Sequence, residues 1–463
     1  MGLGLTGTAT ARFLLARGAR VVASEARPEE ALGGAAAALR EAGARVETGG
    51  HTPGVFDGCE TVIVSPGVPP RLDPLERARA AGAAVISEIE LASRFLQGRI
   101  VGITGSNGKS TVTAMTAAIL SESGRRARPC GNIGLPLIAM AGPPSPPIYV
   151  KDLGREQPGG GDAPDVVYVA EISSFQLEGI ETFRPAAAAL LNLSPDHMDR
   201  YDSPGAYYAA KARIFMNQTS AETAVLNADD PPTWAIAPTL RSRIVPFSVG
   251  GEAGEGVRLR GGALVCARAG AEERLIDASE IPLPGRHNLE NAAASAAVAL
   301  AMGATPDAVR RAVRSFQALP HRLRFVAGVG GADVYDDSKA TNVGSTIRAV
   351  EAFTRPVVLL LGGRDKGGDF PSLVPRLRGR VRAVVTFGEA GPMIADRLEG
   401  ALPVIRGGAL AEAARAALDA AHPGDVVLLA PACASFDAYA NYAARGDDFA
   451  RIVRERAAAE RRP

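Results

Sequence analysis

The sequence is poor in lysine. Only five lysines occur among 463 residues; the other 46 of its 51 basic residues are arginines, and 50 acidic residues leave a formal net charge of +1. No polybasic run is present that would draw the chain to a nucleic acid or an anionic membrane. Because arginine has replaced lysine almost everywhere, we expect the surviving lysines where a compact, chemically modifiable amine is needed. They are Lys109, Lys151, Lys211, Lys339 and Lys366.

Long apolar runs and paired cysteines are also lacking. No stretch approaches the roughly 20 apolar residues of a membrane-spanning helix, and the N-terminus has no basic segment followed by an apolar one. The four cysteines are far apart and form no C-x-x-C pair, which argues against a disulfide framework or a cysteine zinc site. We therefore expect a cytoplasmic protein with reduced thiols that binds no nucleic acid and inserts into no membrane.

An expected strand is missing at the N-terminus. Gly2, Gly4 and Gly7 spell G-x-G-x-x-G, and Glu25 follows at the spacing of a dinucleotide-binding fingerprint, yet no apolar strand precedes them. The glycines could serve a nicotinamide enzyme, or form a phosphate-binding turn for another ligand. We expect a longer native N-terminus that supplies the strand. If Met1 is genuine, the sheet position must be empty or filled otherwise.

The alternation of apolar runs with Ala-rich stretches predicts an α/β protein of three domains. Residues 1–94 are expected to form an N-terminal Rossmann-like domain of βα repeats. Residues 95–317 form a central domain with a P-loop ATPase-like parallel sheet, and residues 318–463 a C-terminal Rossmann-like domain. Within the central domain, the Pro- and Gly-rich segment 142–164 is predicted to be a flexible insertion, and 244–283 a small antiparallel patch.

A Gly-rich loop opens the central domain. The sequence GITGSNGKST (102–111) lies between a predicted strand and a predicted helix, where backbone N–H groups can cradle phosphates. Lys109 would reach the β- and γ-phosphates, and Ser110 would ligate magnesium. Ile103 stands where the regular pattern has glycine, so Gly105 must supply the flexibility. The expected ATP-binding residues are Gly105, Ser106, Asn107, Gly108, Lys109, Ser110 and Thr111.

Three further residues are candidates for chemistry. Glu171 ends the apolar strand VVYVA, and His197 lies beside Asp196 and Asp199 after another buried strand. Each alone could be an ordinary strand-end side chain, but ligands of open α/β sheets bind at this edge. Lys211 lies on a predicted helix, where a solvated lysine is common. In this chain such a position should have become arginine, so the retained amine indicates chemistry.

Two polar loops in the third domain each hold a rare lysine. They are DDSKATNVGS (336–345) and LLLGGRDKGGDF (359–370), and each follows an apolar segment. Either loop alone could be an ordinary turn. Their acids and amines together are suited to anions and a nucleotide.

These motifs together resemble the Mur ligases of peptidoglycan synthesis. The matching stretches run in the family's order from residue 2 to about 450: GSNGKST, GNIG, EISSFQLE, DHMDRY, YAAKARIF, GRHNLENA, PHR, DSKATN, GGRDKG and PACASFD. DSKATN and PACASFD are similar to the branch of the family that adds D-glutamate. The resemblance implies an ATP-dependent acid–amino-acid ligase, acting as a monomer, whose domains close on binding.

The resemblance also implies a reaction. ATP phosphorylates the alanine carboxylate of UDP-N-acetylmuramoyl-L-alanine, which turns a poor leaving group into a good one. The amine of D-glutamate then attacks the acyl phosphate, and a tetrahedral intermediate collapses to an amide, ADP and phosphate. Such transfer depends on positioning and charge neutralisation.

Catalytic roles are implied for Lys109, His197 and Lys211. Ser110 and Glu171 would bind one magnesium ion, and His197 and Lys211 a second. In the family this lysine is carbamylated by CO2, which converts an ammonium into an oxygen ligand suited to a hard cation.

The remaining implied contacts fall into three groups. The nucleotide is contacted by Asn288, Asn291, Arg322 and Asp337. D-Glutamate is contacted by Thr341, Lys366, Ser435 and Tyr442, the last at a position that is often Phe in the family. The UDP-sugar is contacted by Leu5, Thr6, Arg27, Ser65, Gly67 and Asn132.

Three alternatives stay open at this point. A sibling ligase would add a different amino acid, a nicotinamide dehydrogenase would use the opening glycines, and a silent nucleotide-binding module would lack catalysis. No hydride-transfer constellation supports the dehydrogenase. The intact set of Lys109, Glu171, His197 and Lys211 argues against a silent module.

Overall fold

A computed structural model describes residues 1–143, 148–198, 200–251 and 254–460. The chain divides into two compact units, which are treated separately below. The first unit comprises Met1–Leu193, Gly205–Asp277 and Ala292–Val313, and the second comprises Ser194–Pro204, Ala278–Asn291 and Arg314–Pro463. The α/β class expected from the sequence is confirmed, whereas the domain boundaries at 94/95 and 317/318 stay predictions. No described helix combines the length and the apolar character needed to cross a membrane.

The N-terminal strands form two separate parallel pairs. Strand β1 (Val22–Glu25) pairs with β2 (Arg45–Thr48), and β3 (Thr61–Val64) pairs with β4 (Ala84–Ser87). The single sheet expected for this domain is therefore divided. The helices that accompany the strands are α1 (Leu5–Leu15), α2 (Ala35–Glu41), α3 (Asp73–Ala80) and α4 (Glu88–Ser93).

The first three residues connect the two pairs. Gly2 N donates to Ser24 O of β1 at 2.8 Å, and Ser65 N donates to Met1 O at 3.0 Å. The amino group of Met1 donates to Ile63 O of β3 at 2.7 Å. These three residues bond to both pairs at the place where the sequence pattern calls for a strand.

The central domain contains a nine-stranded sheet of order β15-β14-β13-β12-β11-β10-β5-β9-β6. Its central parallel strands β11, β10, β5 and β9 are buried on both faces, which explains the apolar runs in their sequences. The strands are β5 (Arg99–Thr104), β6 (Arg126–Gly131), β9 (Val166–Glu171), β10 (Ala187–Leu190), β11 (Thr223–Asn227), β12 (Arg243–Ser248), β13 (Gly256–Arg260), β14 (Ala263–Arg268) and β15 (Ala271–Asp277).

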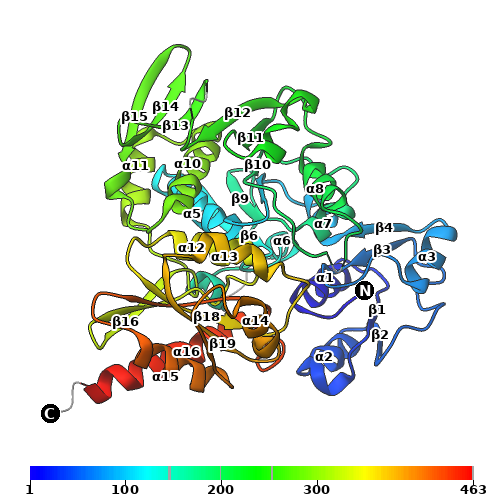
Figure 1. Ribbon diagram of the computed structural model, residues 1–463. Helices are drawn as coiled ribbons and strands as arrows, with labels where there is room; N and C mark the ends of the chain where they lie inside the picture. The colour runs from blue at the N-terminus through cyan, green and yellow to red at the C-terminus, as the bar shows by residue number, and fades with distance from the viewer. Residues whose placement is uncertain (144–147, 199, 252–253, 461–463) are drawn as a thin grey trace. The chain divides into compact units, whose positions relative to one another are not determined.

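The antiparallel patch predicted over 244–283 is confirmed only in part. Strands β13, β14 and β15 pair antiparallel, as expected. However, β12 pairs parallel with β11, and β13 pairs parallel with β12. The patch is therefore an extension of the main sheet, as Figure 1 shows, and no separate element. Short Gly-punctuated segments did not reveal this continuity.

The described part of the predicted insertion contains a hairpin. Strand β7 (Ile148–Val150) pairs antiparallel with β8 (Arg155–Gln157). The Gln157 side chain donates to Pro129 O, and Gly160 N donates to Ala139 O at 2.9 Å. Strands of three residues are too short for a periodicity signal, so the sequence predicted only flexibility. Residues 144–147 of the insertion lie outside the described residues.

Helices of the central domain follow its strands. The long Ala-rich helix predicted from GRHNLENA is α10 (Arg286–Ala301). The others are α5 (Lys109–Glu122), α6 (Leu137–Met140), α7 (Ser174–Glu178), α8 (Pro204–Ala212), α9 (Pro231–Trp234) and α11 (Pro306–Ser315).

The C-terminal sheet has six strands in the order β16-β17-β21-β18-β19-β20. The apolar runs VVLLLGG, AVVTFG and DVVLLAPA contain β18, β19 and β21, and all neighbours except β16 and β17 pair parallel. The antiparallel hairpin of β16 and β17 was not foreseen. The strands are β16 (Arg324–Val329), β17 (Ala332–Asp336), β18 (Val357–Gly362), β19 (Val381–Phe387), β20 (Val404–Arg406) and β21 (Val426–Ala432).

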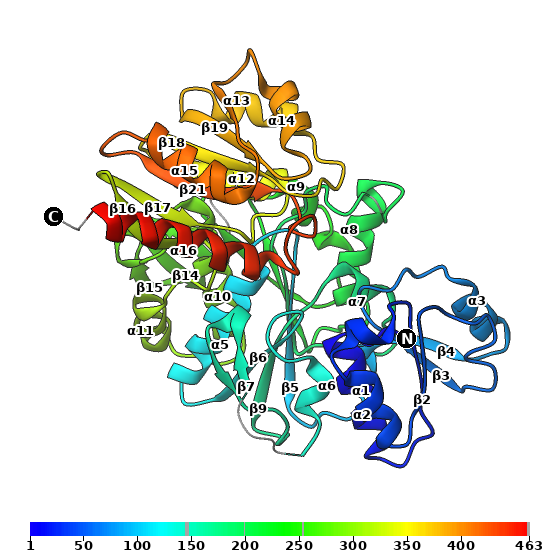
Figure 2. The ribbon, with the colours of Figure 1, turned by 90° about the horizontal axis from the view of Figure 1, so that it is seen from below.

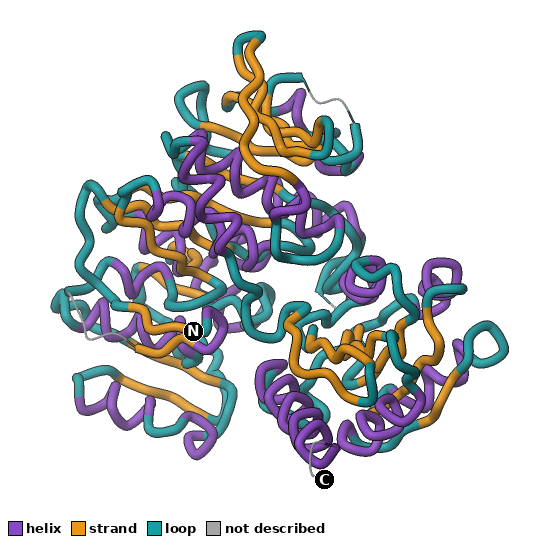
Figure 3. Tube along the Cα trace, turned by 90° about the vertical axis from the view of Figure 1, so that its left-hand side faces the viewer, coloured by secondary structure: helices purple, strands orange, loops and turns teal. Residues whose placement is uncertain are grey.

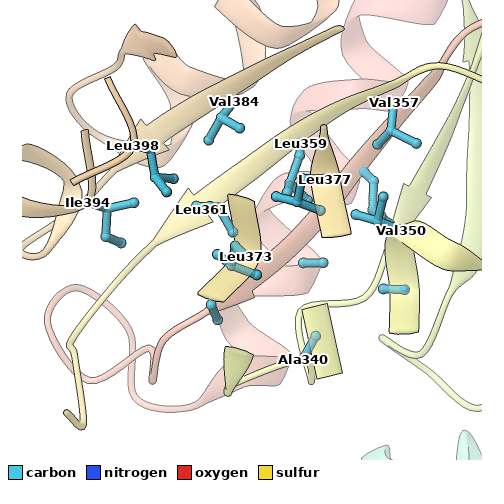
Figure 4. Close-up of a cluster of buried hydrophobic side chains, with 14 of the residues drawn as sticks. Ala340, Val350, Val357, Leu359, Leu361, Leu373, Leu377, Val384, Ile394 and Leu398 are labelled. Atoms are coloured by element: carbon cyan, nitrogen blue, oxygen red, sulfur yellow. The ribbon is translucent and has the colours of Figure 1, made fainter. Parts of the chain in front are cut away.

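Both faces of this sheet are covered by helices (Figure 3). Along β18, Leu359 and Leu361 belong to one buried cluster (Figure 4), whereas Val358 and Leu360 belong to another on the opposite face. This alternation follows from the two-residue period of a strand. Helix α16 runs along β16 and β17 (Figure 2). The helices are α12 (Val343–Glu351), α13 (Val374–Leu377), α14 (Gly391–Leu398), α15 (Leu410–Ala420) and α16 (Tyr442–Glu460).

Candidate active site

The Gly-rich loop joins β5 to α5 in the first unit. Gly105 has φ +149° and Gly108 has φ +87°, values that side chains rarely allow. A Cβ on Gly105 would lie 3.0 Å from Leu191 Cβ. The loop thus depends on Gly105, as its variant sequence predicted. Lys109 Nζ donates to Gly105 O and Ser106 O, both at 2.9 Å, so the ammonium lies over its own loop at the start of α5.

Asn192 holds this loop from the neighbouring strand. It lies two residues after β10 and is buried. Its Oδ1 accepts from Asn107 N at 2.9 Å, its Nδ2 donates to Asn107 O at 3.1 Å, and its backbone oxygen accepts from Ser106 N at 2.9 Å. A carboxamide carries one donor end and one acceptor end, so it satisfies both backbone groups of Asn107. Sequence reasoning missed this residue, although it follows a buried strand just as Glu171 does.

Glu171 lies beside the loop at the carboxyl end of β9. Its Oε2 accepts from Ser110 Oγ at 2.5 Å, and its Oε1 accepts from Asn132 Nδ2 at 3.0 Å. Asn132 N also donates to Glu171 O at 2.8 Å. A hydroxyl and a carboxylate in contact form the hard oxygen set that magnesium prefers. The residues proposed for one metal ion are therefore brought together, and Asn132, expected in the UDP-sugar site, joins them.

Lys211 is buried in the first unit. It is 2% exposed, although lysines are almost never fully buried without a partner. Its Nζ lies 4.6 Å from the ring centroid of Tyr207 on the same helix, α8. The alternative of a solvated surface lysine is thus excluded. Within the described chain, no cluster of three or more His, Cys, Asp or Glu side chains could hold a metal ion.

Asp196 organises polar groups of the second unit. Its Oδ2 accepts from Asn342 Nδ2 at 2.9 Å, and its Oδ1 lies 3.5 Å from Lys366 Nζ. His197, at φ +58°, follows it with Nε2 3.8 Å from Asp196 Oδ2. Lys366 and His197 thus share one carboxylate. The proposed metal ligands are divided, since Ser110, Glu171 and Lys211 belong to the first unit and His197 to the second.

Of the residues expected to contact the nucleotide from the second unit, Asn288, Asn291 and Asp337 are buried and Arg322 is half-buried. Asn291 Nδ2 donates to Asn288 Oδ1 at 3.1 Å, and Asn288 Nδ2 donates to Pro284 O at 2.7 Å. Burial raises the pKa of Asp337 to about 7, against the opposing charge of Arg322.

His321 and Asp336 form a buried pair near these groups. His321 Nδ1 lies 2.6 Å from Asp336 Oδ2. His321 has φ +59° and makes an edge contact with the Tyr442 ring at 6.2 Å. The ammonium of Lys339 lies 3.7 Å from the centroid of the same ring. Tyr442 therefore packs against a histidine and a lysine of the PHR and DSKATN motifs.

The proposed amino-acid residues lie on three loops of the C-terminal sheet. Thr341 follows β17, Lys366 follows β18, and Ser435 follows β21. These strands are neighbours in the order β17-β21-β18 and run parallel, so their loops leave from one edge. Tyr442 begins α16, directly after the third loop. The structure brings together the three loops and the helix start that contain these four residues.

In the N-terminal glycine turn, the acidic residue Glu25 is hydrogen-bonded within the protein. Glu25 accepts from Leu3 N at 2.6 Å and from Arg27 N, Nε and Nη2 at 3.0, 3.1 and 3.1 Å. Burial works to raise the pKa of Glu25, but these hydrogen bonds lower it to about 2. In a dinucleotide site, Glu25 would accept a hydrogen bond from a ribose hydroxyl; here it is bound to Arg27. Ser65 Oγ donates to Gly2 O at 3.1 Å, and Leu5 is 65% exposed.

Known families match nearly the whole chain. The MurD-like N-terminal domain of Mur ligases matches residues 1–87, the Mur ligase middle domain residues 103–299, and the Mur ligase glutamate ligase domain residues 321–433. The chain belongs to the Mur ligase family. The dehydrogenase alternative raised by the opening glycines is therefore wrong.

Curated relatives agree with these matches. A protein of Acidobacterium capsulatum named UDP-N-acetylmuramoylalanine-D-glutamate ligase is 45% identical over 98% of this chain and 95% of its own. A protein of Desulfosudis oleivorans with the same name is 43% identical over the same shares. Among solved structures, a pseudomurein peptide ligase type C from Methanothermus fervidus aligns with a TM-score of 0.60 over 98% of both chains. At 17% identity, that likeness shows the fold alone.

Proposed function

We propose that this Mur ligase adds D-glutamate to UDP-N-acetylmuramoyl-L-alanine at the expense of ATP, through an acyl phosphate. The proposal is carried by the relatives named as D-glutamate ligases, which are 45% and 43% identical to this chain over 98% of its length. The match of residues 321–433 to a glutamate ligase domain supports it. The reaction belongs to peptidoglycan precursor synthesis, which we place in the cytoplasm, with the chain acting as a monomer.

In this proposal the first unit handles the phosphates. The backbone N–H groups of the loop from Gly105 to Thr111 cradle them, and Lys109 turns from its loop carbonyls to the transferring phosphate. Ser110 and Glu171, already in contact, would hold a magnesium ion that neutralises phosphate charge. The residues proposed to hold the UDP-sugar are Leu5, Thr6, Arg27, Ser65, Gly67 and Asn132, with Arg27 as its cation.

Lys211 is proposed to carry a CO2-derived carbamate and, with His197, to hold a second magnesium ion. An ammonium cannot ligate a cation, but a carbamate offers oxygens. The burial of Lys211 supports the role, because an ordinary solvated lysine would be exposed.

In the second unit, we assign the adenine side to Asn288 and Asn291, and the nucleotide's other contacts to Arg322 and Asp337. Thr341, Lys366, Ser435 and Tyr442 are assigned to D-glutamate. Lys366 would exchange the carboxylate of Asp196, 3.5 Å from its Nζ, for a substrate carboxylate, because both groups offer anionic oxygens.

A panel of amino acids scored by ADP release tests the function. With ATP, magnesium and UDP-N-acetylmuramoyl-L-alanine, we expect D-glutamate to give the highest kcat/KM. L-Alanine and diaminopimelate, the substrates expected of sibling ligases, should give little release. Equal or better turnover with either of them would reject the proposal.

A further inference from the structure

One arginine of the second unit is completely buried and is not among the residues assigned to a substrate or a metal ion. Arg445, in the first turn of α16, is 0% exposed and is the largest fully buried side chain among the residues that the structure describes. Burial lowers its pKa to about 10, so it remains charged at neutral pH. Among the described residues no ion pair includes it, and its recorded partners are neutral oxygens. A buried charge of this kind needs a structural reason.

Its guanidinium bonds to three loops. Nε donates to Ser338 Oγ at 3.0 Å and Nη2 to Ser338 O at 2.9 Å, on the loop after β17. Nη1 donates to Gly362 O at 3.4 Å, at the end of β18. Nη1 and Nη2 each donate to Cys433 O at 3.2 Å, and Nη1 donates to Ala434 O at 3.2 Å, on the loop after β21. A single side chain thus reaches the ends of three adjacent strands.

These loops are the ones that carry the proposed amino-acid contacts. Thr341 lies three residues after Ser338, Lys366 four after Gly362, and Ser435 directly after Ala434. Tyr442 lies one helical turn before Arg445 on α16. Every residue assigned to D-glutamate is therefore within a few residues of a bond to this guanidinium, or on its own helix turn.

The loop backbones are shaped around the arginine. Gly362 and Gly363 have φ +152° and +123°, and Ala432 has φ +61°. A Cβ on Gly363 would lie 2.2 Å from Ala434 O and 2.9 Å from Arg445 Nη1, so only glycine lets the two loops approach each other beside the guanidinium. Without the guanidinium, the carbonyls of Gly362 and Cys433 would lose a charged donor in the protein interior. The bent loops would then have less to hold their spacing.

We propose that Arg445 is a positioning residue of the amino-acid site, whose guanidinium fixes the relative spacing of the loops that carry Thr341, Lys366 and Ser435. The inference rests on the proposed function, in which the substrate is D-glutamate. A dicarboxylate binds through two separated anionic ends, so its affinity depends on the spacing of the donors that face it. Lysine could not replace arginine, because one ammonium offers three donors and no planar fork.

Arg445→Met is the first test. We expect the KM for D-glutamate to rise about 10- to 100-fold, because small displacements of positioning groups have effects of this size. The KM for the UDP-sugar should stay within about twofold, since none of the residues assigned to the UDP-sugar lies on a loop bonded to Arg445. Initial rates with each substrate varied in turn, together with thermal unfolding, separate these effects.

Arg382→Met is the matched control. Arg382 donates from Nη2 to Asp425 Oδ1 at 3.0 Å, at the amino ends of β19 and β21, opposite the three loops. This variant should lower the melting temperature without changing the KM for D-glutamate. A purely structural role for Arg445 would make the two variants alike.

Arg445→Lys keeps the charge but loses the fork, and it serves if the Met variant does not fold. We expect a KM for D-glutamate between those of the wild type and Arg445→Met. A folded Arg445→Lys or Arg445→Met with the wild-type KM would overturn the inference, as would an equal rise in Arg382→Met. Failure of the proposed function would appear differently, as no D-glutamate-dependent ADP release by the wild type. The amino acid that the wild type does use would then replace D-glutamate in the same comparison.

Discussion

One buried polar side chain holds the phosphate loop of the central domain, and another holds three loops of the C-terminal domain. The two side chains offer different hydrogen-bonding groups. In the central domain, the carboxamide of Asn192 meets one N–H and one C=O of a single loop residue. In the C-terminal domain, the guanidinium of Arg445 meets only acceptors, drawn from three loops. The N–H groups of a phosphate-binding loop must point toward the ligand. The side chain that holds this loop therefore bonds to the backbone of one loop residue. An amino-acid site assembled from several loops needs a multiple donor at its centre.

The difference predicts a division of effects. Changes on the phosphate-loop side should act on phosphoryl transfer whichever amino acid is offered. Changes on the C-terminal side should act on the KM for D-glutamate.

Lys109→Met should have the largest effect. Loss of the cation at the transferring phosphate should lower kcat about 10³-fold, the size seen for charge-stabilising groups in phosphoryl transfer. Lys366→Met is the matched lysine of the other region and should mainly raise the KM for D-glutamate. Steady-state rates with D-glutamate varied distinguish the two. A changed KM in Lys109→Met with kcat preserved would break the comparison.

Lys211→Arg should lower kcat about 10²-fold or more although the positive charge is kept, because a guanidinium forms no carbamate and so offers no ligand oxygen. The wild type, but not the variant, should lose activity when CO2 and bicarbonate are removed. Near wild-type turnover in Lys211→Arg would contradict the carbamate role. Thermal unfolding controls for the larger side chain at this buried position.

Asn192→Asp should raise the KM for ATP about tenfold. The new carboxylate oxygen would face Asn107 O, where Nδ2 now donates at 3.1 Å, and an acceptor left unpaired there costs about 1–3 kcal/mol. Asn227→Asp is the matched control on the neighbouring strand, because Asn227 is equally buried and donates to Leu191 O at 2.9 Å. Both variants should lose stability, but only Asn192→Asp should weaken ATP. An equal effect on both would reduce Asn192 to a packing role.

Glu88→Gln should leave activity almost unchanged, since Glu88 belongs to neither loop group. Burial raises the pKa of Glu88 to about 7, against hydrogen bonds from Ile138 N and Gln176. The folded protein therefore keeps this proton while the unfolded chain loses it, and stability falls as pH rises from about 4.5 to 7. The loss is at most about 3 kcal/mol. Glu88→Gln should remove this fall, measured as melting temperature against pH.

Glu90→Gln supplies the opposite sign. Burial works to raise the pKa of Glu90, but hydrogen bonds from Thr182 Oγ1 and from the amides of Glu181 and Phe183 lower it below its usual value. Its ionised form stabilises the fold above the unfolded pKa, and this contribution disappears on acidification. Glu90→Gln should therefore be destabilising at neutral pH and less so in acid. The same sign for both variants would contradict the two burial arguments.

The sequence alone determined the α/β class, the nucleotide loop and the strand ends that carry polar residues. Strand β9, loop 105–109 and helix α5 lie within short stretches whose periodicity and glycines are local signals. The scarcity of lysine singled out Lys211, which the structure places in the interior. It also singled out Lys339 and Lys366, which lie on loops at the carboxyl edge of the C-terminal sheet.

Only the tertiary structure decided which polar groups meet. The contact of Asp196 with Lys366 joins residues 170 positions apart, and Arg445 joins Ser338, 107 positions away, to two other loops. No local pattern marks such residues, because strand order and parallel pairing determine which loops emerge side by side. The same holds for the divided N-terminal strands and for the extension of the central sheet by β13, β14 and β15. Strand pairing joins segments that lie far apart in the sequence, so short sequence windows do not predict it.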